Sequence, residues 1–225
     1  MLTEFRTTHK VFPVDSSGGK DCLILNVEMN HNVNTNLEEW GIPINVTPEQ
    51  KILWTQIIDV WRKFAGSIPE PSLDLGAAMQ QGRTVSVDPF PRGFVDVQAI
   101  GEQMPFRNDC FASIVLESVL KHVLSPEQTL KEAHRVLYPG GFLFVTSPVN
   151  HIDKHRHSFT SNYLCKTIEN AGFRITKKMG LGFSLKRIDS VIRRRFSKFY
   201  TTIRSPVRFC STIFLIAKVE KKMNA

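Results

Sequence analysis

The chain has 225 residues, enough for one α/β domain with a sizeable core and short additions but not comfortably for two domains. Apolar residues make up 42% and charged residues 22%, as in ordinary globular proteins, and no apolar run reaches the ~18 residues of a membrane-spanning helix. The net charge of +8 comes mostly from residues 183–208, which hold eight Lys and Arg residues against one Asp.

Residues 1–45 contain loop-like stretches rich in Asn, Ser and Gly, and we interpret them as an N-terminal extension that precedes a domain spanning residues 46–220. The four cysteines lie far apart along the chain and form no C-x-x-C pair. Their spacing predicts reduced, buried thiols, a cytoplasmic location and no metal site. These cysteines are Cys22, Cys110, Cys165 and Cys210.

The first predicted helix begins at Thr47 and Pro48 and ends near Gly66. Thr47 is a suitable N-cap, and Pro48 suits the first helical position. Apolar residues then recur at spacings of three and four as far as Phe64. This pattern is typical of one amphipathic helix.

Four short apolar segments follow, at residues 73–76, 85–88, 113–117 and 139–148, each bounded by Gly, Pro or an acidic residue. Such runs are typical of buried parallel strands. Two helices are predicted between and after them, one capped by Ser125 and one from 160 to 171. Final strands are predicted at 173–176 and 210–217. The alternation predicts an α/β fold with a doubly wound, mostly parallel sheet covered on both faces.

Gly76 and Asp88 each end one of these predicted strands. In an open α/β sheet, ligands bind beyond the carboxyl ends of the strands. A glycine there allows the backbone to turn sharply close to a ligand, and a carboxylate can accept hydrogen bonds from ribose hydroxyls. Both residues are also common in ordinary turns, so the pair alone leaves a purely structural role open.

The order and spacing of several motifs resemble those of class I S-adenosylmethionine-dependent methyltransferases, and within them the methyltransferase type 11 group. The motifs are Leu73-Asp74-Leu75-Gly76, Met104-Pro105-Phe106 and Arg135-Val136-Leu137-Tyr138-Pro139-Gly140-Gly141. The resemblance covers about residues 72–175. It implies a seven-stranded, Rossmann-like methyltransferase fold whose last strand, near residues 212–218, runs antiparallel.

The resemblance also implies S-adenosylmethionine as the cofactor. Gly76 and its neighbours would face the methionine part of the cofactor, Asp88 would hold the ribose, and Glu117 would lie near the reacting sulfonium. Ile100 and Gly101 would flank the adenine. The implied cofactor-binding residues are Asp74, Gly76, Ala77, Ala78, Asp88, Ile100, Gly101 and Glu117. The implied activity is methyl transfer to a small or lipid-linked acceptor.

Three positions depart from the family pattern. Ala78 stands where the family usually has a second glycine, Ile100 replaces an acidic residue, and Ala112 replaces the aspartate that usually follows the phenylalanine at Phe111. We interpret Ile100 and Ala112 as two carboxylates missing from the donor side. This leaves open an alternative, a catalytically silent, methyltransferase-like interaction module with a degenerate cofactor site.

Two histidines are candidate catalytic residues, His122 after the third predicted strand and His157 after the fourth. A histidine can act as a general base at neutral pH. A structural histidine that bonds a backbone group, or a merely polar loop, remains the alternative for each.

The basic segment 183–208 contains an apolar stripe at helical spacing, and we interpret it as a basic helical cap inserted before the last strand. A lid over an anionic substrate and a surface helix attracted to acidic lipids are alternatives. Nucleic acid is disfavoured because the aromatic residues lie on the apolar stripe and are not interleaved with the basic ones.

Overall fold

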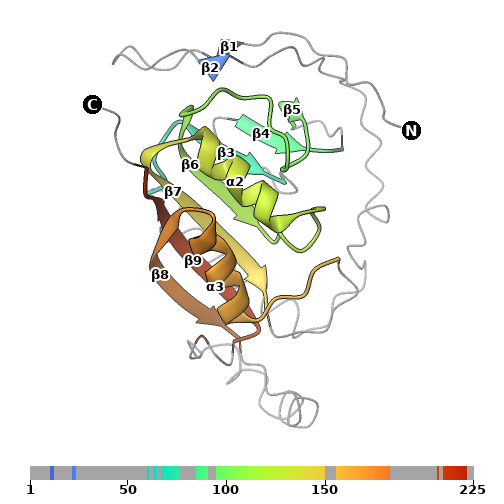
Figure 1. The fold of residues 1–225 in the computed structure, drawn as a ribbon, viewed down its shortest axis with the longest axis vertical. Helices are drawn as coiled ribbons and strands as arrows, with labels where there is room; N and C mark the ends of the chain where they lie inside the picture. The colour runs from blue at the N-terminus through green and yellow to red at the C-terminus, as the bar shows by residue number, and fades with distance from the viewer. Residues whose placement is uncertain are drawn as a thin grey trace.

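A computed structural model describes residues 11–12, 22–23, 60, 63–64, 67–76, 85–90, 95–149, 156–182, 207 and 210–221 of the chain. Its main feature is a seven-stranded sheet in the order β5-β4-β3-β6-β7-β9-β8 (Figure 1). The strands are β3 (Ser72–Leu75), β4 (Val85–Asp88), β5 (Val97–Gln98), β6 (Phe111–Glu117), β7 (Leu137–Pro148), β8 (Phe173–Leu181) and β9 (Thr212–Val219). Two further strands, β1 (Val11–Phe12) and β2 (Cys22–Leu23), pair antiparallel with each other in a separate sheet.

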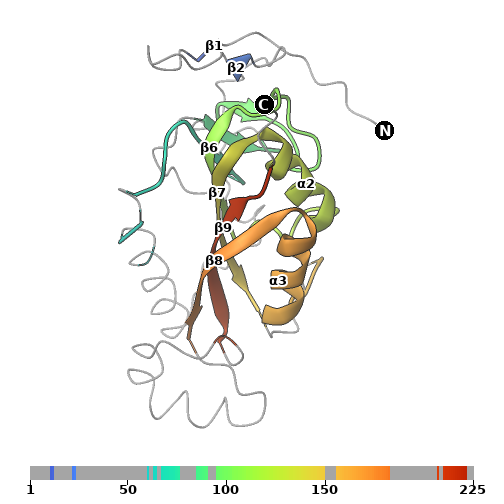
Figure 2. The same cartoon turned by 60° about the vertical axis from the view of Figure 1, so that its left-hand side comes forward.

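The five strands from β5 to β7 are parallel, whereas β9 runs antiparallel to both of its neighbours. The prediction of a mostly parallel seven-stranded sheet with an antiparallel last strand is therefore confirmed. The helices α2 (Pro126–Val136) and α3 (Ser161–Asn170) both lie on one side of the sheet (Figure 2).

Both helices begin and end where local sequence signals predict. The Ser125 hydroxyl accepts a hydrogen bond from the Gln128 N–H at 3.1 Å, and Pro126 occupies the first turn of α2. In α3 the Thr160 hydroxyl accepts from the Tyr163 N–H at 3.2 Å. Gly172, with φ of +93°, ends that helix in a left-handed conformation.

Each face of the sheet packs into its own apolar core. On the side of α2 and α3, which we call the helix face, residues such as Leu73, Leu116 and Leu143 are fully buried against the helices. On the opposite face, Val115, Phe144, Phe214 and other apolar residues form a second cluster. There the Phe64 ring stacks on Phe214 with centroids 5.2 Å apart.

The structure differs from the sequence expectation at three strands. β5 has only two residues, too few for an apolar run to announce it. β7 begins at Leu137, directly after α2, because Leu137 pairs with Phe111 at the start of β6. β8 continues to Leu181 because it pairs with β9 along its whole length.

Several predictions fall largely outside the described residues. Of the helix expected between Thr47 and Gly66, the structure describes Val60, Lys63 and Phe64, which are helical. Most of the N-terminal extension 1–45 and of the basic cap 183–208 also lies outside. Among the helices that the structure describes, none is long and apolar enough to cross a membrane.

The expectation that all four thiols are reduced is wrong, since Cys110 is disulfide-bonded. Cys165 and Cys210 are free and buried, as expected. Spacing along the chain did not reveal the disulfide, because a cross-link depends on which residues folding brings together.

Candidate functional site

The carboxyl ends of β4, β3 and β6 lie side by side at one edge of the sheet. Leu75 at the end of β3 pairs with Val87 of β4 and with Leu116 of β6. One residue later along each strand come Gly76, Asp88 and Glu117. The structure therefore brings these three predicted site residues together at the edge where open α/β sheets bind ligands.

Side chains along these strands alternate between the two faces of the sheet. Leu73, Leu75, Ile114 and Leu116 belong to the helix-face core. The intervening polar residues therefore face the opposite side of the sheet, which we call the polar face. These are Asp74 on β3, Ser86 and Asp88 on β4, and Glu117 on β6.

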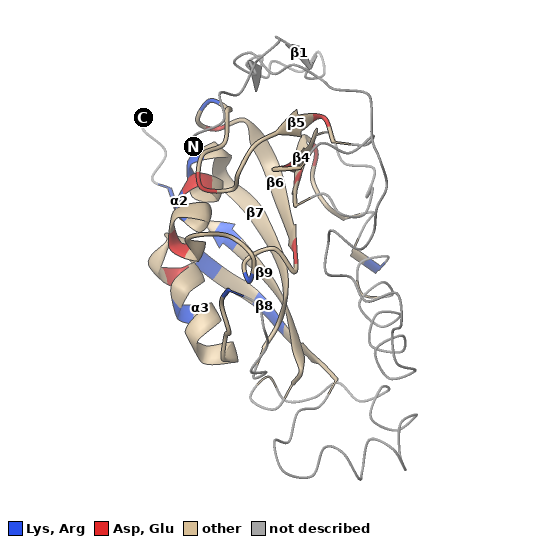
Figure 3. Cartoon of the chain, turned by 90° about the vertical axis from the view of Figure 1, so that its right-hand side faces the viewer, with Lys and Arg blue, Asp and Glu red and all other residues tan. Residues whose placement is uncertain are grey.

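Charge is distributed unevenly across the sheet. Asp and Glu are found on β4 and β6, whereas the exposed part of β8 and the end of β9 carry Lys and Arg (Figure 3). Asp74 and Asp88 are almost fully buried, with 3% and 2% of their surface exposed. Buried carboxylates cost stability unless they are hydrogen-bonded, so their concentration at one edge indicates a site rather than a solvated surface.

Gly76 holds the turn after β3 in a conformation that favours glycine. Its φ is +74°, and its N–H donates to the Val87 carbonyl at 2.7 Å. A Cβ at this position would collide with Cγ2 of Val119, in the loop after β6. Both the backbone angle and the close approach of Val119 therefore require the absence of a side chain.

The Asp88 carboxylate is oriented by its own turn, because Oδ1 accepts a hydrogen bond from the Phe90 N–H at 2.9 Å. Each carboxylate oxygen can accept more than one hydrogen bond. Asp88 is thus held at the strand end while keeping acceptor capacity for hydroxyl groups.

Glu117 ends β6 and is only partly exposed. Burial raises the pKa of its carboxyl from 4.5 to about 7, because desolvation disfavours the charged form. Near neutral pH this group therefore exists in both protonation states.

The loop after β5 carries Ile100 and Gly101, the residues expected to flank adenine. Ile100 forms an isolated bridge with Gln103. Gly101 is buried, and a Cβ there would crowd Thr129 of α2 and Leu75 of β3. Gly101 therefore lets this loop pack closely against the helix and the strand end.

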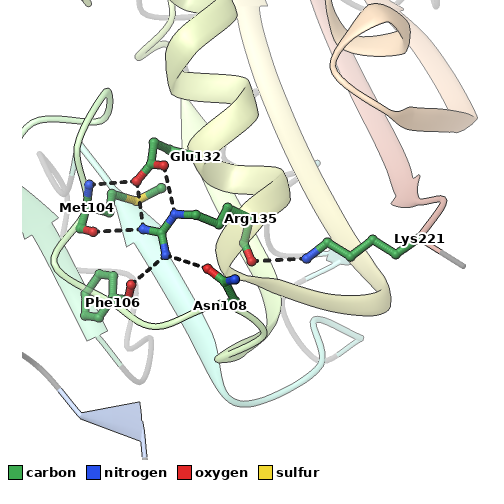
Figure 4. A network of polar contacts seen from close by, with 6 residues as sticks. All are labelled: Met104, Phe106, Asn108, Glu132, Arg135 and Lys221. Carbon is green, nitrogen blue, oxygen red and sulfur yellow. Dashed lines mark hydrogen bonds and ion pairs between the residues drawn. The ribbon is translucent and has the colours of Figure 1, made fainter. Parts of the chain in front are cut away.

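Sequence reasoning missed the residues that hold this loop in place. The Arg135 guanidinium donates to the carbonyls of Met104 and Phe106 at 3.0 and 2.7 Å and forms an ion pair with Glu132 (Figure 4). Glu132 also accepts from the Met104 N–H. Burial alone would raise the pKa of Glu132, but the hydrogen bonds from Arg135 and Met104 outweigh it and lower the pKa below its usual value.

Glu102 holds the loop after β5 at a second point. The Glu102 carboxylate accepts from the N–H groups of Leu124 and Ser125, the latter at 3.0 Å. It thereby joins the loop after β5 to the segment that leads from β6 into α2. Only folding brings these residues together, although the Arg135-Val136-Leu137 motif marked the position of the arginine.

The two candidate catalytic histidines lie in neighbouring positions. His122 is exposed in the turn after β6, where its N–H donates to the Val119 carbonyl. His157 contacts the same loop, since its Nε2 lies 3.0 Å from the Val123 carbonyl. Because a carbonyl only accepts, Nε2 must carry the proton, and a general-base role for His157 would fall to Nδ1.

One predicted departure from the family does not concern the site. Ala112 lies at the amino end of β6, five residues before Glu117, which corresponds to about 16 Å along a strand. The interpretation that a carboxylate is missing there from the donor side is therefore wrong. Ala77 and Ala78 lie outside the described residues. Within the described part of the chain, no cluster of His, Cys, Asp and Glu could hold a metal ion.

Comparison with known proteins agrees with this arrangement. Residues 71–145, from the start of β3 almost to the end of β7, match the family model described as a methyltransferase domain. This stretch, one third of the chain, is therefore similar to a methyltransferase domain of the type 11 group. The family's methyl donor is S-adenosylmethionine.

Solved structures share the fold of this methyltransferase domain at low sequence identity. A possible histamine N-methyltransferase from Thermotoga maritima is 16% identical, with a TM-score of 0.53 over 75% of this chain and 98% of its own. A methyltransferase from Archaeoglobus fulgidus is 15% identical, with a TM-score of 0.51 over 72% and 92%. The [4+2]-cyclase SpnF is 14% identical, with a TM-score of 0.52 over 74% and 82%. A search of curated proteins found no match.

The described residues fit S-adenosylmethionine in their chemistry. Asp88 offers a buried, oriented carboxylate of the kind that binds two ribose hydroxyls. Gly76 provides backbone without a side chain, and Glu117 provides a carboxyl group at the end of the neighbouring strand. When bound, S-adenosylmethionine supplies a methyl group on a positively charged sulfur. The residues of this chain would bind and orient it and exclude water around it.

Proposed function

We propose that this protein transfers a methyl group from S-adenosylmethionine to a small or lipid-linked acceptor. The observation that carries the proposal is the juxtaposition of Gly76, Asp88 and Glu117 at three adjacent strand ends. The match of residues 71–145 to the methyltransferase domain supports the same assignment.

Each of the three residues has a distinct part in the proposal. Gly76 lets the backbone approach the methionine end of the donor, and Asp88 accepts hydrogen bonds from the ribose. Glu117 faces the reacting end, where its negative form favours a cation. Positioning of donor and acceptor supplies much of the rate of a displacement of this kind.

The competing hypothesis is a catalytically silent interaction module. With Ala112 remote from the strand ends, only Ala78 and Ile100 still argue for it. The likeness to a cyclase as well as to methyltransferases nevertheless means that the fold does not by itself fix the reaction. Donor binding is therefore the property that separates the two hypotheses.

Isothermal titration with S-adenosylhomocysteine tests the proposal. We expect saturable binding by the parent protein and at least a tenfold weaker affinity for Asp88→Asn, the loss expected when hydrogen bonds to a charged acceptor become neutral ones. Asp109→Asn is the matched control. Asp109 lies just before the amino end of β6, where it pairs with Lys221. This control should bind like the parent.

No heat of binding at millimolar ligand would remove the proposal and favour the silent module. Equal losses in Asp88→Asn and Asp109→Asn would show that the change in charge, and not the position of Asp88, weakens binding.

A further inference from the structure

Thr146 lies beside Glu117 on the polar face of the sheet. It belongs to β7, pairs with Glu117 of β6 on one side and faces Phe214 of β9 on the other. Its neighbours Val145 and Leu143 belong to the helix-face core, whereas Phe144 belongs to the opposite cluster. Strand alternation therefore directs the Thr146 side chain to the same face as Glu117.

The Thr146 hydroxyl is buried without a hydrogen-bond partner in the described part of the chain. Only 1% of the residue surface is exposed, and Oγ1 makes no hydrogen bond with the described residues. Buried hydroxyl groups in native proteins are nearly always paired, so each exception requires an explanation. A ligand that completes the bond is one such explanation.

The surroundings of Thr146 define which side a ligand could occupy. Toward β9, Phe214 is fully buried and stacked on Phe64, so that direction is filled by aromatic rings. Toward β3, the same row continues through Glu117 to Gly76. Glu117 and Thr146 therefore lie between the predicted cofactor-binding residues and the stacked rings of Phe214 and Phe64.

The charged groups that share this face are few among the described residues. Asp74 and Asp88 lie on the cofactor side. On the far side, Lys177 of β8 places its ammonium over the Phe64 ring, 4.6 Å from the centroid. Next to Glu117, β7 places uncharged Thr146, and β9 places uncharged Phe214 on the far side of Thr146. Among the described residues of the sheet, Glu117 is therefore the acidic group directly beside the Thr146 hydroxyl in the strand register.

We propose that Glu117 and Thr146 form the polar end of the acceptor site and recognise a nucleophilic amine or hydroxyl group. This inference rests on the proposed methyl transfer. The acceptor nitrogen or oxygen forms the new bond to the methyl carbon, and the carbon–sulfur bond breaks with its electrons remaining on sulfur. The acceptor proton passes to the Glu117 carboxylate, and Thr146 hydrogen-bonds the nucleophile and orients it.

The protonation behaviour of Glu117 suits this role. Since burial raises its pKa to about 7, its carboxylate is a stronger base than an exposed one yet is still largely ionised slightly above neutral pH. An exposed carboxylate of ordinary pKa would hold the proton poorly.

Binding of sinefungin tests the proposed roles of Glu117 and Thr146 although the acceptor is not known. It resembles S-adenosylhomocysteine but carries a protonated amine where the transferable methyl group would lie, and so presents an N–H donor toward the acceptor side. We expect its affinity relative to S-adenosylhomocysteine, measured by titration calorimetry in the same protein, to rise at least fivefold from pH 5.5 to 8.

Two variants test whether Glu117 and Thr146 cause this preference for sinefungin. Glu117→Gln should abolish the rise with pH, and Thr146→Val, which keeps the shape of the side chain, should lower the preference for sinefungin about two- to fivefold at pH 8. Asp109→Asn should behave like the parent. Because the readout is a ratio of two affinities, partial unfolding of a variant does not imitate it.

The outcomes separate this inference from the proposed function. If both ligands bind but their ratio is independent of pH, or is unchanged in Glu117→Gln, the inference fails together with the part given to Glu117 in the proposed function, whereas donor binding stands. If the parent binds neither ligand, both fail. Should Glu117→Gln not fold, the pH profiles of the parent and Thr146→Val decide the matter.

Discussion

The two faces of the strands β3, β4, β6 and β7 carry opposite chemistry. On the helix face most residues are apolar and belong to the core that includes residues of α2 and α3. On the polar face the same strands end in two buried aspartates, a glutamate of raised pKa and a threonine with an unpaired hydroxyl. The site is therefore formed by polar residues at the carboxyl ends of strands whose other residues, including Val115 and Phe144 on the same face, build the core.

The difference between the two faces shows where the sequence stabilises the fold and where its buried polar groups destabilise it. A buried carboxylate or hydroxyl destabilises a fold unless hydrogen bonds compensate it. Apolar residues at the same positions would stabilise the domain more. Local violations of the rules of folding are expected at functional sites, and here they gather at one edge of one face.

The largest difference between the faces should appear on truncating the core. Leu116→Ala removes a fully buried side chain from the helix face and should lower the free energy of unfolding by about 2–5 kcal/mol. Thr146→Val on the polar face removes an unpaired hydroxyl while keeping its volume. It should leave stability unchanged or raise it by up to ~1 kcal/mol.

Urea unfolding followed by circular dichroism measures both changes. The two residues lie on adjacent strands at nearly the same height, so each change reports on its own face at the same level of the sheet. A loss of several kcal/mol in Thr146→Val would show that its hydroxyl is bonded in solution, and the contrast between the faces would be broken.

A smaller difference between the two faces should appear in how the free energy of unfolding depends on pH. In the folded protein Glu117 binds its proton up to about pH 7, whereas in the unfolded chain it releases it near 4.5. Stability from this group is therefore present below pH 4.5 and is lost as pH rises through 7. The partly exposed position reduces the total loss to about 2–3 kcal/mol.

Urea unfolding at pH 5 and pH 8 tests this sign. Glu117→Gln should remove most of the decline, because an amide does not titrate in this range. His134, whose pKa is lowered mainly by burial, also titrates with folding and is common to both proteins. Parallel pH profiles in the parent and the variant would show that Glu117 is not desolvated.

The sequence predicted those features that depend on neighbours along the chain. Ser125 caps α2, and Gly172 ends α3, because capping needs only residues a few positions apart. Gly76 and Asp88 were found because each directly ends an apolar run. β5 was missed because two residues carry no periodicity.

What the sequence did not predict depends on contacts between distant residues. The Ala112 error arose because the direction of β6 decides which end of a strand reaches the site. Glu102 and Arg135 form hydrogen bonds with residues that lie more than twenty positions away in the sequence. Thr146 could have been noticed in the sequence, since it is the first polar residue after the apolar run 142–145. Only the strand register, however, shows that it lies beside Glu117.

The smallest effect is expected where the helix face meets the site, at Arg135. Arg135→Met removes hydrogen bonds to the Met104 and Phe106 carbonyls and the partner of Glu132. Because the side chain is 31% exposed, water replaces part of what is lost. We expect a loss of about 1–2 kcal/mol in the free energy of unfolding, and a smaller one in Arg135→Lys, which keeps the charge but not the fork.

The same variant sharpens the division between the faces, because the loop that Arg135 holds continues to Gly101 at the site. Glu102 still ties this loop to the N-terminus of α2 in the variant. The affinity for S-adenosylhomocysteine should therefore fall less than about threefold, against at least tenfold for Asp88→Asn. Calorimetric titration of Arg135→Lys and Arg135→Met decides the point. A tenfold loss in either would mean that contacts on the helix side set the shape of the cofactor site, and that stability and binding are not divided between the two faces.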